Sequence, residues 1–334
     1  MDIFTNRNNM KLLSVIFPLI LLVVEGLGSY RHDVMSHSHW HFIDRSECGL
    51  VKIYPRLAKG EAVKINRFPW MVQVLQRTVT GKNEVSDKFV CSGALINKHY
   101  AVTPAHCVAG YEKLTKFIRL GESLRISCIP AFDDCSSRKV KIDSILIHEG
   151  YDKVTLANDI ALIRLDEELK FNENVRPICL PSDDLLDSKY LGEKVQVAGW
   201  GLDSAEITSQ ILKFVVLPTR DRCVCEQIFN STLGDNRLCI GIDDMVDTCE
   251  GDPGSPVVWT RQENFFTRHY LIGLSSYGDD DCGVMPGVYT NMGKYVKWIL
   301  DNILGSEFDT IFQFVNHNVV QLDYQPEGES GLSA

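Results

Sequence analysis

Short apolar runs separated by turn-forming residues constrain the fold of this chain more than any other feature. From about residue 57 onward the clearest runs span three to six residues, a length typical of β-strands and too short for most helices. Glycine, proline and asparagine lie between them, as in all-β sandwiches and barrels. The runs are residues 70–75, 94–96, 139–142, 160–165, 195–198 and 270–274.

One helix is predicted near the end of the chain, over Asn291–Leu304. There Val296, Ile299, Ile303 and Leu304 recur at helical spacing. The sequence therefore predicts an all-β fold that ends in a helix.

The first 28 residues have the layout of a secretory signal peptide. Arg7 and Lys11 precede an apolar stretch of 13 residues, 12–24, and small residues follow at 26–29. A membrane anchor is the alternative, but a spanning helix needs about 20 apolar residues. We therefore expect a secreted, extracellular protein, with residues 1–28 as the signal peptide.

Eleven cysteines fit a secreted protein, because an oxidising compartment converts most thiols to disulfides. Their odd number leaves at least one thiol free or bonded to another molecule. Asn230-Ser231-Thr232 is a sequon, so we expect a glycan on Asn230 in a surface loop. The formal net charge of −10 argues against nucleic acid as a partner, because phosphate binding requires a basic surface.

Residues 29–56 form a polar segment that is rich in histidine. Four histidines lie close together there: His32, His37, His39 and His41. Imidazoles are good metal ligands, so a metal site is one interpretation. We favour the other, a mobile pro-segment that binds no metal.

The stretch Asp247–Val257 reads Asp-Thr-Cys-Glu-Gly-Asp-Pro-Gly-Ser-Pro-Val. It resembles the loop that carries the nucleophile in trypsin/chymotrypsin-like serine proteases, whose pattern is Cys-x-Gly-Asp-Ser-Gly-Gly-Pro. The matching positions are Cys249, Gly251, Asp252, Gly254 and Pro256. Pro253 stands in the place of the nucleophilic serine, and Ser255 in that of the following glycine. The chain thus resembles a protease that lacks the attacking atom.

Two more motifs resemble the same family. Thr103–Cys107 (Thr-Pro-Ala-His-Cys) is similar to the segment of the general-base histidine, and Asn158–Leu162 (Asn-Asp-Ile-Ala-Leu) to that of its aspartate. The order His106, Asp159, nucleophile position is the chymotrypsin order. Further matches are Pro69-Trp70, Cys91-Ser92-Gly93, Arg176–Pro181, Gly199-Trp200-Gly201 and Pro286–Thr290.

The resemblance covers about 250 residues. It implies two six-stranded antiparallel β-barrels of the chymotrypsin type with a C-terminal helix. Residues 57–304 would be the trypsin-like domain, residues 29–56 its pro-segment, and residues 305–334 a tail outside the core.

In this family a neutral imidazole takes the proton of the nucleophilic hydroxyl, and a buried carboxylate holds its tautomer. By resemblance, His106 and Asp159 match these two groups. Pro253 has no hydroxyl and no backbone N–H, and in this family that N–H forms the oxyanion hole together with the residue matching Gly251. Loss of the nucleophile costs about 10⁶-fold in turnover in a related mechanism, and loss of one oxyanion donor about 10²–10³-fold. We predict a catalytically inactive homologue; Ser255 as a displaced nucleophile is the alternative.

The resemblance also implies a substrate-binding pocket for Arg or Lys side chains. Asp247 matches the carboxylate at the base of the pocket, and Gly278 and Gly287 match the two glycines that keep it open. Tyr277 replaces the tryptophan that is usual before the first glycine. Ser276 matches the serine that supports the triad aspartate.

Activation in the family begins with a cut after Arg or Lys, and the new amino terminus folds inward to pair with an aspartate. Arg56 matches the cut site, Leu57 the new terminus and Asp252 its partner. Lys59 departs from the family pattern at a glycine position.

The family's disulfides imply five pairs here: Cys91–Cys107, Cys249–Cys282, Cys48–Cys179, Cys225–Cys239 and Cys128–Cys135, the last as in some arthropod-type members. Cys223 is then unpaired. Its pairing with Cys239 instead, or with another chain, is the alternative.

We therefore expect a secreted, inactive protease homologue that acts as a binding or regulatory cofactor, or as a decoy, in an extracellular proteolytic cascade. Similar homologues in arthropods act in immune responses such as melanisation. The expected partners are proteases, zymogens or peptides that contain Arg or Lys, with a disulfide-linked partner at Cys223 as a further expectation. No cofactor is implied. The alternative is an active trypsin-like endopeptidase.

Overall fold

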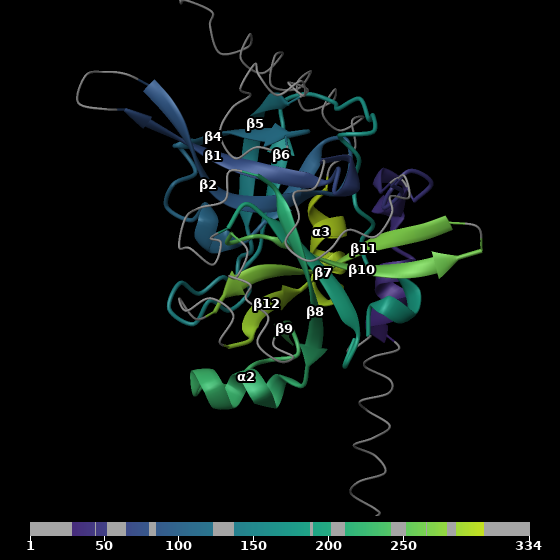
Figure 1. Ribbon diagram of the computed structural model, residues 1–334. Helices are drawn as coiled ribbons and strands as arrows, with labels where there is room; N and C mark the ends of the chain where they lie inside the picture. The colour runs from purple at the N-terminus through teal and green to yellow at the C-terminus, as the bar shows by residue number, and fades with distance from the viewer. Residues whose placement is uncertain are drawn as a thin grey trace, which may run out of the picture.

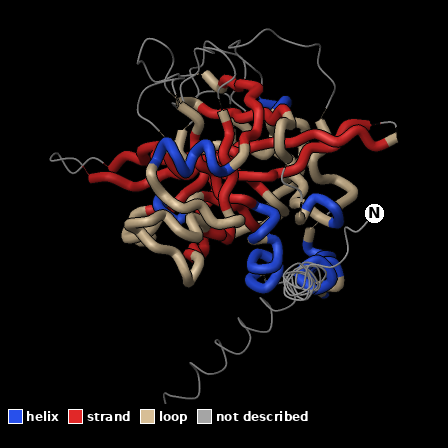
Figure 2. Tube along the Cα trace, turned by 90° about the horizontal axis from the view of Figure 1, so that it is seen from below, coloured by secondary structure: helices blue, strands red, loops and turns tan. Residues whose placement is uncertain are grey.

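The chain folds into two closed β-barrels, each built from six antiparallel strands (Figure 1). The computed structural model describes residues 29–43, 45–51, 65–79, 85–122, 137–187, 190–201, 211–241, 252–264, 266–278 and 285–303. The strands form a central body with the helices on its outside (Figure 2). This architecture confirms the predicted pair of six-stranded barrels with a C-terminal helix.

The first barrel has the strand order β1-β2-β3-β6-β5-β4. Its strands are β1 (Met71–Val79), β2 (Val85–Leu95), β3 (Tyr100–Thr103), β4 (Thr115–Leu120), β5 (Arg138–Ile147) and β6 (Ala161–Leu165). Side chains that alternate between buried and exposed along each strand build the core of this barrel. In β4, Ile118 and Leu120 are buried on either side of the half-buried Arg119, and in β5, Val140 and Ile142 are buried on either side of the exposed Lys141.

The second barrel has the strand order β10-β11-β12-β9-β8-β7. Its strands are β7 (Lys194–Gly199), β8 (Lys213–Arg220), β9 (Arg237–Ile240), β10 (Pro256–Glu263), β11 (Phe266–Tyr277) and β12 (Gly287–Asn291). Long strands β10 and β11 pair along their whole common length and extend beyond the barrel as a hairpin (Figure 1).

The C-terminal helix is shorter than the prediction of Asn291–Leu304. A 3-10 turn, η5 (Met292–Lys294), comes first, and α3 (Val296–Asn302) follows. The Asn291 side chain accepts a hydrogen bond from the Gly293 amide at 3.2 Å and caps this tighter turn. A sequence periodicity of 3.6 residues does not distinguish such a turn from the first turn of an α-helix.

The remaining helical elements are short. They are α2 (Arg222–Phe229) and the 3-10 turns η1 (Ser38–Phe42), η2 (Ile65–Arg67), η3 (Ala105–Cys107) and η4 (Asp183–Leu185), together with a helical stretch at residues 29–35. Asp221 caps the first turn of α2 by accepting from the Cys223 amide. Among the described residues, no helix is both long and apolar enough to cross a bilayer.

Residues 29–51, which we call the N-terminal arm, pack against the second barrel and α3. The prediction of a mobile segment is therefore wrong for the described part of the arm. Val34 and Ile43 are 0% and 3% exposed and belong to the main hydrophobic core. Polar and apolar residues are mixed irregularly between these two side chains, so no sequence period revealed the contact.

Three disulfides lie within the described residues: Cys48–Cys179, Cys91–Cys107 and Cys225–Cys239. Cys223 is an exposed free thiol on α2. The other four cysteines of the expected pairs, Cys128, Cys135, Cys249 and Cys282, lie outside the described residues.

Candidate functional site

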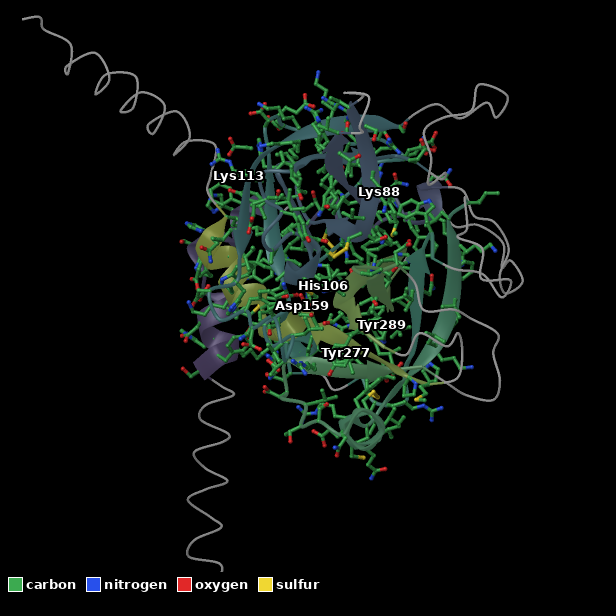
Figure 3. The ribbon with its side chains drawn as sticks, turned by 90° about the vertical axis from the view of Figure 1, so that its left-hand side faces the viewer. Lys88, His106, Lys113, Asp159, Tyr277 and Tyr289 are labelled. Carbon is green, nitrogen blue, oxygen red and sulfur yellow. A yellow bond between two sulfur atoms is a disulfide. The ribbon has the colours of Figure 1, made fainter. Side chains whose placement is uncertain are left out.

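Strand pairing brings His106 and Asp159 together. β3 pairs antiparallel with β6, with Thr103 opposite Ala161, so residues just after β3 lie beside residues just before β6. The Nδ1 atom of His106 is 2.8 Å from Oδ2 of Asp159, and the His106 amide donates to Oδ1 at 2.9 Å (Figure 3). This two-point contact fixes the orientation of the imidazole ring.

Asp159 is 2% exposed, and its polar atoms bond to both barrels. The Ser276 hydroxyl, from β11, donates to Oδ2 at 2.5 Å, and the Thr290 hydroxyl, from β12, donates to the Asp159 carbonyl at 2.8 Å. A buried carboxylate is stable only when such donors satisfy it. Ser276 thus lies where the resemblance placed the serine that supports the aspartate.

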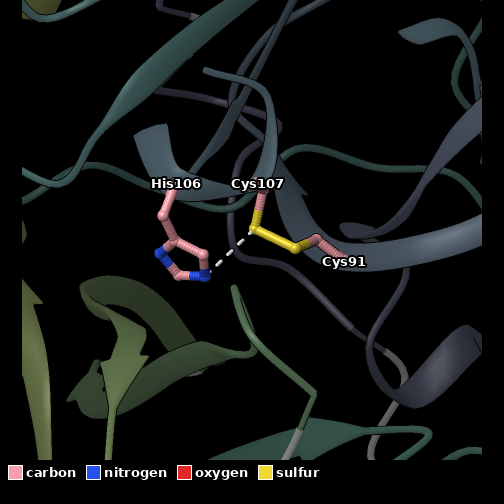
Figure 4. A group of neighbouring side chains, drawn as sticks. All are labelled: Cys91, His106 and Cys107. Atoms are coloured by element: carbon pink, nitrogen blue, oxygen red, sulfur yellow. Dashed lines mark hydrogen bonds between the residues drawn. A yellow bond between two sulfur atoms is a disulfide. The ribbon is translucent and has the colours of Figure 1, made fainter. Parts of the chain in front are cut away.

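The other ring nitrogen of His106 faces a disulfide. Its Nε2 atom lies 3.6 Å from Sγ of Cys107, which is bonded to Cys91 (Figure 4). These three side chains bring ligand-type atoms within 4.8 Å of one another. Because each sulfur is bonded to the other, neither offers the thiolate that a metal requires. The cluster is an imidazole packed against a disulfide.

Two of the histidines of the N-terminal arm contact α3, and the four do not converge on a common centre. His37 Nε2 lies 3.1 Å from Oδ1 of Asp301, and His39 Nδ1 lies 2.7 Å from the Leu300 carbonyl. Within the described part of the chain these histidines form no group with metal-ligand geometry.

The loop 252–255 is seated against the first barrel next to His106. Pro253 is exposed, and its carbonyl accepts a hydrogen bond from the Ser92 amide at 2.8 Å. Gly254 has φ +85°, and a Cβ on it would lie 2.1 Å from the Ser92 carbonyl oxygen and 2.8 Å from Cδ of Pro104. Only glycine fits there, so this position holds the loop close to the segment that carries His106.

The Ser255 side chain lies inside the protein. It is 0% exposed, and its hydroxyl makes no hydrogen bond with any described residue. Its Oγ atom lies 2.5 Å from where a Cβ on Gly199 would be, at the end of β7. A nucleophile must bond to its base or reach it without refolding, so this placement disfavours Ser255 as a displaced nucleophile.

A family model for trypsin matches residues 57–299, which is most of the chain. The chain belongs to the trypsin family.

Several trypsin-family relatives come from insects. Serine protease grass of Drosophila melanogaster is 35% identical over 266 residues, which is 74% of this chain and 68% of that protein. Phenoloxidase-activating factor 3 of Holotrichia diomphalia is 34% identical over 275 residues, or 78% and 76% of the two chains. A crystal structure of Drosophila Grass, described as a clip serine protease of the Toll pathway, superposes with a TM-score of 0.67 at 31% identity and covers 80% of this chain and 77% of that one.

Of the three residues that match the activation residues of the trypsin family, the structure describes only Asp252. Asp252 is 6% exposed, and its Oδ2 atom accepts a hydrogen bond from the Trp200 amide. Arg56 and Leu57 lie outside the described residues, as does Gly251, the expected oxyanion residue.

Arg237, on β9, bonds to the residue before Gly278, a contact that the sequence did not predict. Arg237 donates from one Nη to the Tyr277 hydroxyl at 3.2 Å and from the other to the Thr155 carbonyl at 2.5 Å. It ties the segment before Asp159 to the end of β11, and no motif marks it. Gly278 follows Tyr277 directly, whereas Asp247 lies outside the described residues. Gly287 begins β12 opposite Ile240.

The close approach at Gly254 predicts a large loss of stability on substitution by alanine. Gly254→Ala should lower the free energy of unfolding by about 2–5 kcal/mol, because a left-handed backbone and a collision with the Ser92 carbonyl act together. Gly110→Ala is the matched control, since Gly110 has φ +81° with nothing within 4 Å. It should cost about 1 kcal/mol. Urea unfolding measures both, and equal losses would contradict the proposed seating of the loop.

Proposed function

We propose that this protein is a catalytically inactive trypsin-family homologue that acts as a binding or regulatory partner in an extracellular proteolytic cascade. The observation that carries the proposal is Pro253 at the position of the nucleophile. A proline side chain cannot form an acyl-enzyme, and a proline nitrogen cannot donate to an oxyanion. Both losses occur at one residue.

The expected loss of turnover distinguishes the two functions that we consider, an inactive homologue and an active endopeptidase. Removal of the nucleophile alone lowers turnover about 10⁶-fold in a related triad mechanism. An active enzyme would need Ser255 in its place, yet that hydroxyl is buried against Gly199. Opening the loop to expose it would break the contact of Gly254 with the first barrel. The inactive interpretation therefore has the stronger support.

We further propose that the protein keeps a site for basic side chains. Asp247 would provide the carboxylate for an Arg or Lys side chain, and Gly278 and Gly287 would leave the entrance open. Such a pocket can bind a peptide segment without cleaving it. A partner protease, a zymogen or a peptide containing Arg or Lys would present the matching group.

Secretion and cleavage complete the proposal. Residues 1–28 would be removed as a signal peptide, and a trypsin-like enzyme would cut after Arg56, so that the Leu57 amine could pair with Asp252. The trypsin-like domain would be residues 57–304, followed by the tail 305–334. Three disulfides and insect relatives among the serine proteases support an extracellular setting.

An immune cascade is the setting that the relatives favour. One of them is named a phenoloxidase-activating factor, and another is described as part of the Toll pathway. The free Cys223 provides an exposed thiol for a disulfide-linked partner. A hydrogen bond to the Asp221 carboxylate raises the pKa of this thiol, so the reactive thiolate is disfavoured at neutral pH.

Peptide hydrolysis by the cleaved protein tests the proposal. The native protein should not hydrolyse a substrate with Arg at the scissile bond, whereas Pro253→Ser combined with Ser255→Gly should raise turnover at least about 10³-fold. This gain is expected because Asp159 is already hydrogen-bonded to both His106 and Ser276.

The control adds His106→Ala to the double variant and should remove the gained activity. Native turnover that disappears in Ser255→Ala would contradict the proposal and identify Ser255 as the nucleophile.

Glycosylation of Asn230 is a second, independent proposal. Asn230 is the exposed C-cap of α2 in a left-handed conformation with φ 47°, and Thr232 is also exposed. The ring of the preceding Phe229 contacts that of Tyr277 at 5.5 Å, so a glycan would project beside the pocket wall. Peptide-N-glycosidase should lower the apparent mass of the secreted protein. Asn230→Gln and Thr232→Ala should abolish that shift, and Ser231→Ala should not. A shift that survives Asn230→Gln would disprove this assignment.

A further inference from the structure

The first half of the N-terminal arm lies along α3 and η5. The Tyr30 hydroxyl donates to the Gly293 carbonyl at 2.8 Å, and His39 Nδ1 lies 2.7 Å from the Leu300 carbonyl. Figure 3 shows this segment, in purple, beside the yellow C-terminal helix. One contact lies in η5 and the other near the end of α3, so together they fix the direction of the arm as well as its position.

Apolar burial accompanies these polar contacts. Val34 and Ile43 are 0% and 3% exposed and join the same core as Val296, Ile299 and Ile303. If the arm left, these two side chains would be exposed to water, which opposes dissociation.

The second half of the arm is held through its backbone. The Gly49 amide donates to the Pro177 carbonyl at 2.9 Å, and the Gly49 carbonyl accepts from the His269 amide at 3.0 Å. Gly49 has φ +65°, and a Cβ there would lie 2.3 Å from the His269 carbonyl oxygen. The arm therefore approaches β11 as closely as a glycine backbone allows.

A half-buried arginine reinforces the same contact. Arg268 donates to the carbonyls of Arg45 and Cys48 at 2.9 and 2.8 Å, and its side chain also pairs with Glu263 at 2.8 Å. The Cys48–Cys179 disulfide lies next to these bonds. It is thus one of several attachments along the arm.

We propose that the arm is a permanent part of the folded protein. It stays bound after a cut at Arg56 even without the Cys48–Cys179 disulfide. The bound arm covers the outer face of α3, so that this face is closed to other proteins. The biological meaning of this inference rests on the proposed cleavage at Arg56. The test below uses an introduced cleavage site and does not depend on it.

The experiment replaces residues 53–56 of the full-length secreted protein by the recognition sequence of a site-specific protease. In the same protein Cys48→Ser and Cys179→Ser remove the disulfide. After cutting, size-exclusion chromatography in native buffer and mass spectrometry of the fractions show whether the arm co-elutes with the remaining chain. Co-elution is expected at micromolar protein. Separate elution of the arm would overturn the inference and leave the proposed inactivity untouched.

Two arm variants test the specific contacts. On the same background, Val34→Asp should lower the retained arm at least about tenfold, because a carboxylate cannot be buried in this core without a partner. His32→Asp places the same side chain at an exposed arm position and should change nothing. Equal retention in both variants would contradict the docking described here.

A second route applies if the cysteine variant is not secreted. The protein with its native cysteines is cut after folding and then reduced with dithiothreitol in native buffer before chromatography. Retention of the arm is expected again, and its release would overturn the inference.

Discussion

The buried carboxylate of Asp159 links the two barrels. It accepts hydrogen bonds from His106 of the first barrel and from Ser276 of the second, while its carbonyl accepts from Thr290. Loss of one partner of a buried charge typically costs about 3–5 kcal/mol. These residues therefore stabilise the interface between the barrels whether or not they take part in chemistry. A chain that has lost catalysis still has a physical reason to keep them.

The nucleophile position is under no comparable constraint. Pro253 is exposed, and its only described backbone bond uses its carbonyl, which proline retains. The neighbouring Gly254 is held by its close approach to Ser92. The loop can therefore keep its position while its reactive residue changes. This contrast explains how the trypsin-family fold can accommodate a proline at this position.

The sequence predicted the barrels because turn-bounded runs and ordered motifs are local signals. The pairing of His106 with Asp159 followed from the same motifs, since β3 and β6 bring their ends together. Helix α2 was missed because its eight residues are too few for a clear period. The burial of Ser255 could not be predicted from sequence, because it depends on Gly199, far away in the chain.

Two other features could not be predicted from the sequence, for a different reason. Docking of the arm depends on hydrogen bonds to distant parts of the chain and on the burial of Val34 and Ile43 within a histidine-rich segment. The arrangement around Arg237 depends on residues from three separate parts of the chain, Thr155, Arg237 and Tyr277. Neither produces a periodic pattern or a motif. Contacts of this kind arise from tertiary packing alone.

We propose that no residue of the native site can attack an electrophile. Treating the native, cleaved protein with a fluorophosphonate and measuring its intact mass tests this most directly, because the reagent labels an activated serine whatever its position. We predict that the native, cleaved protein forms no stoichiometric adduct. An adduct that peptide mapping places on Ser255 would contradict it and show that the loop opens to form a different active site.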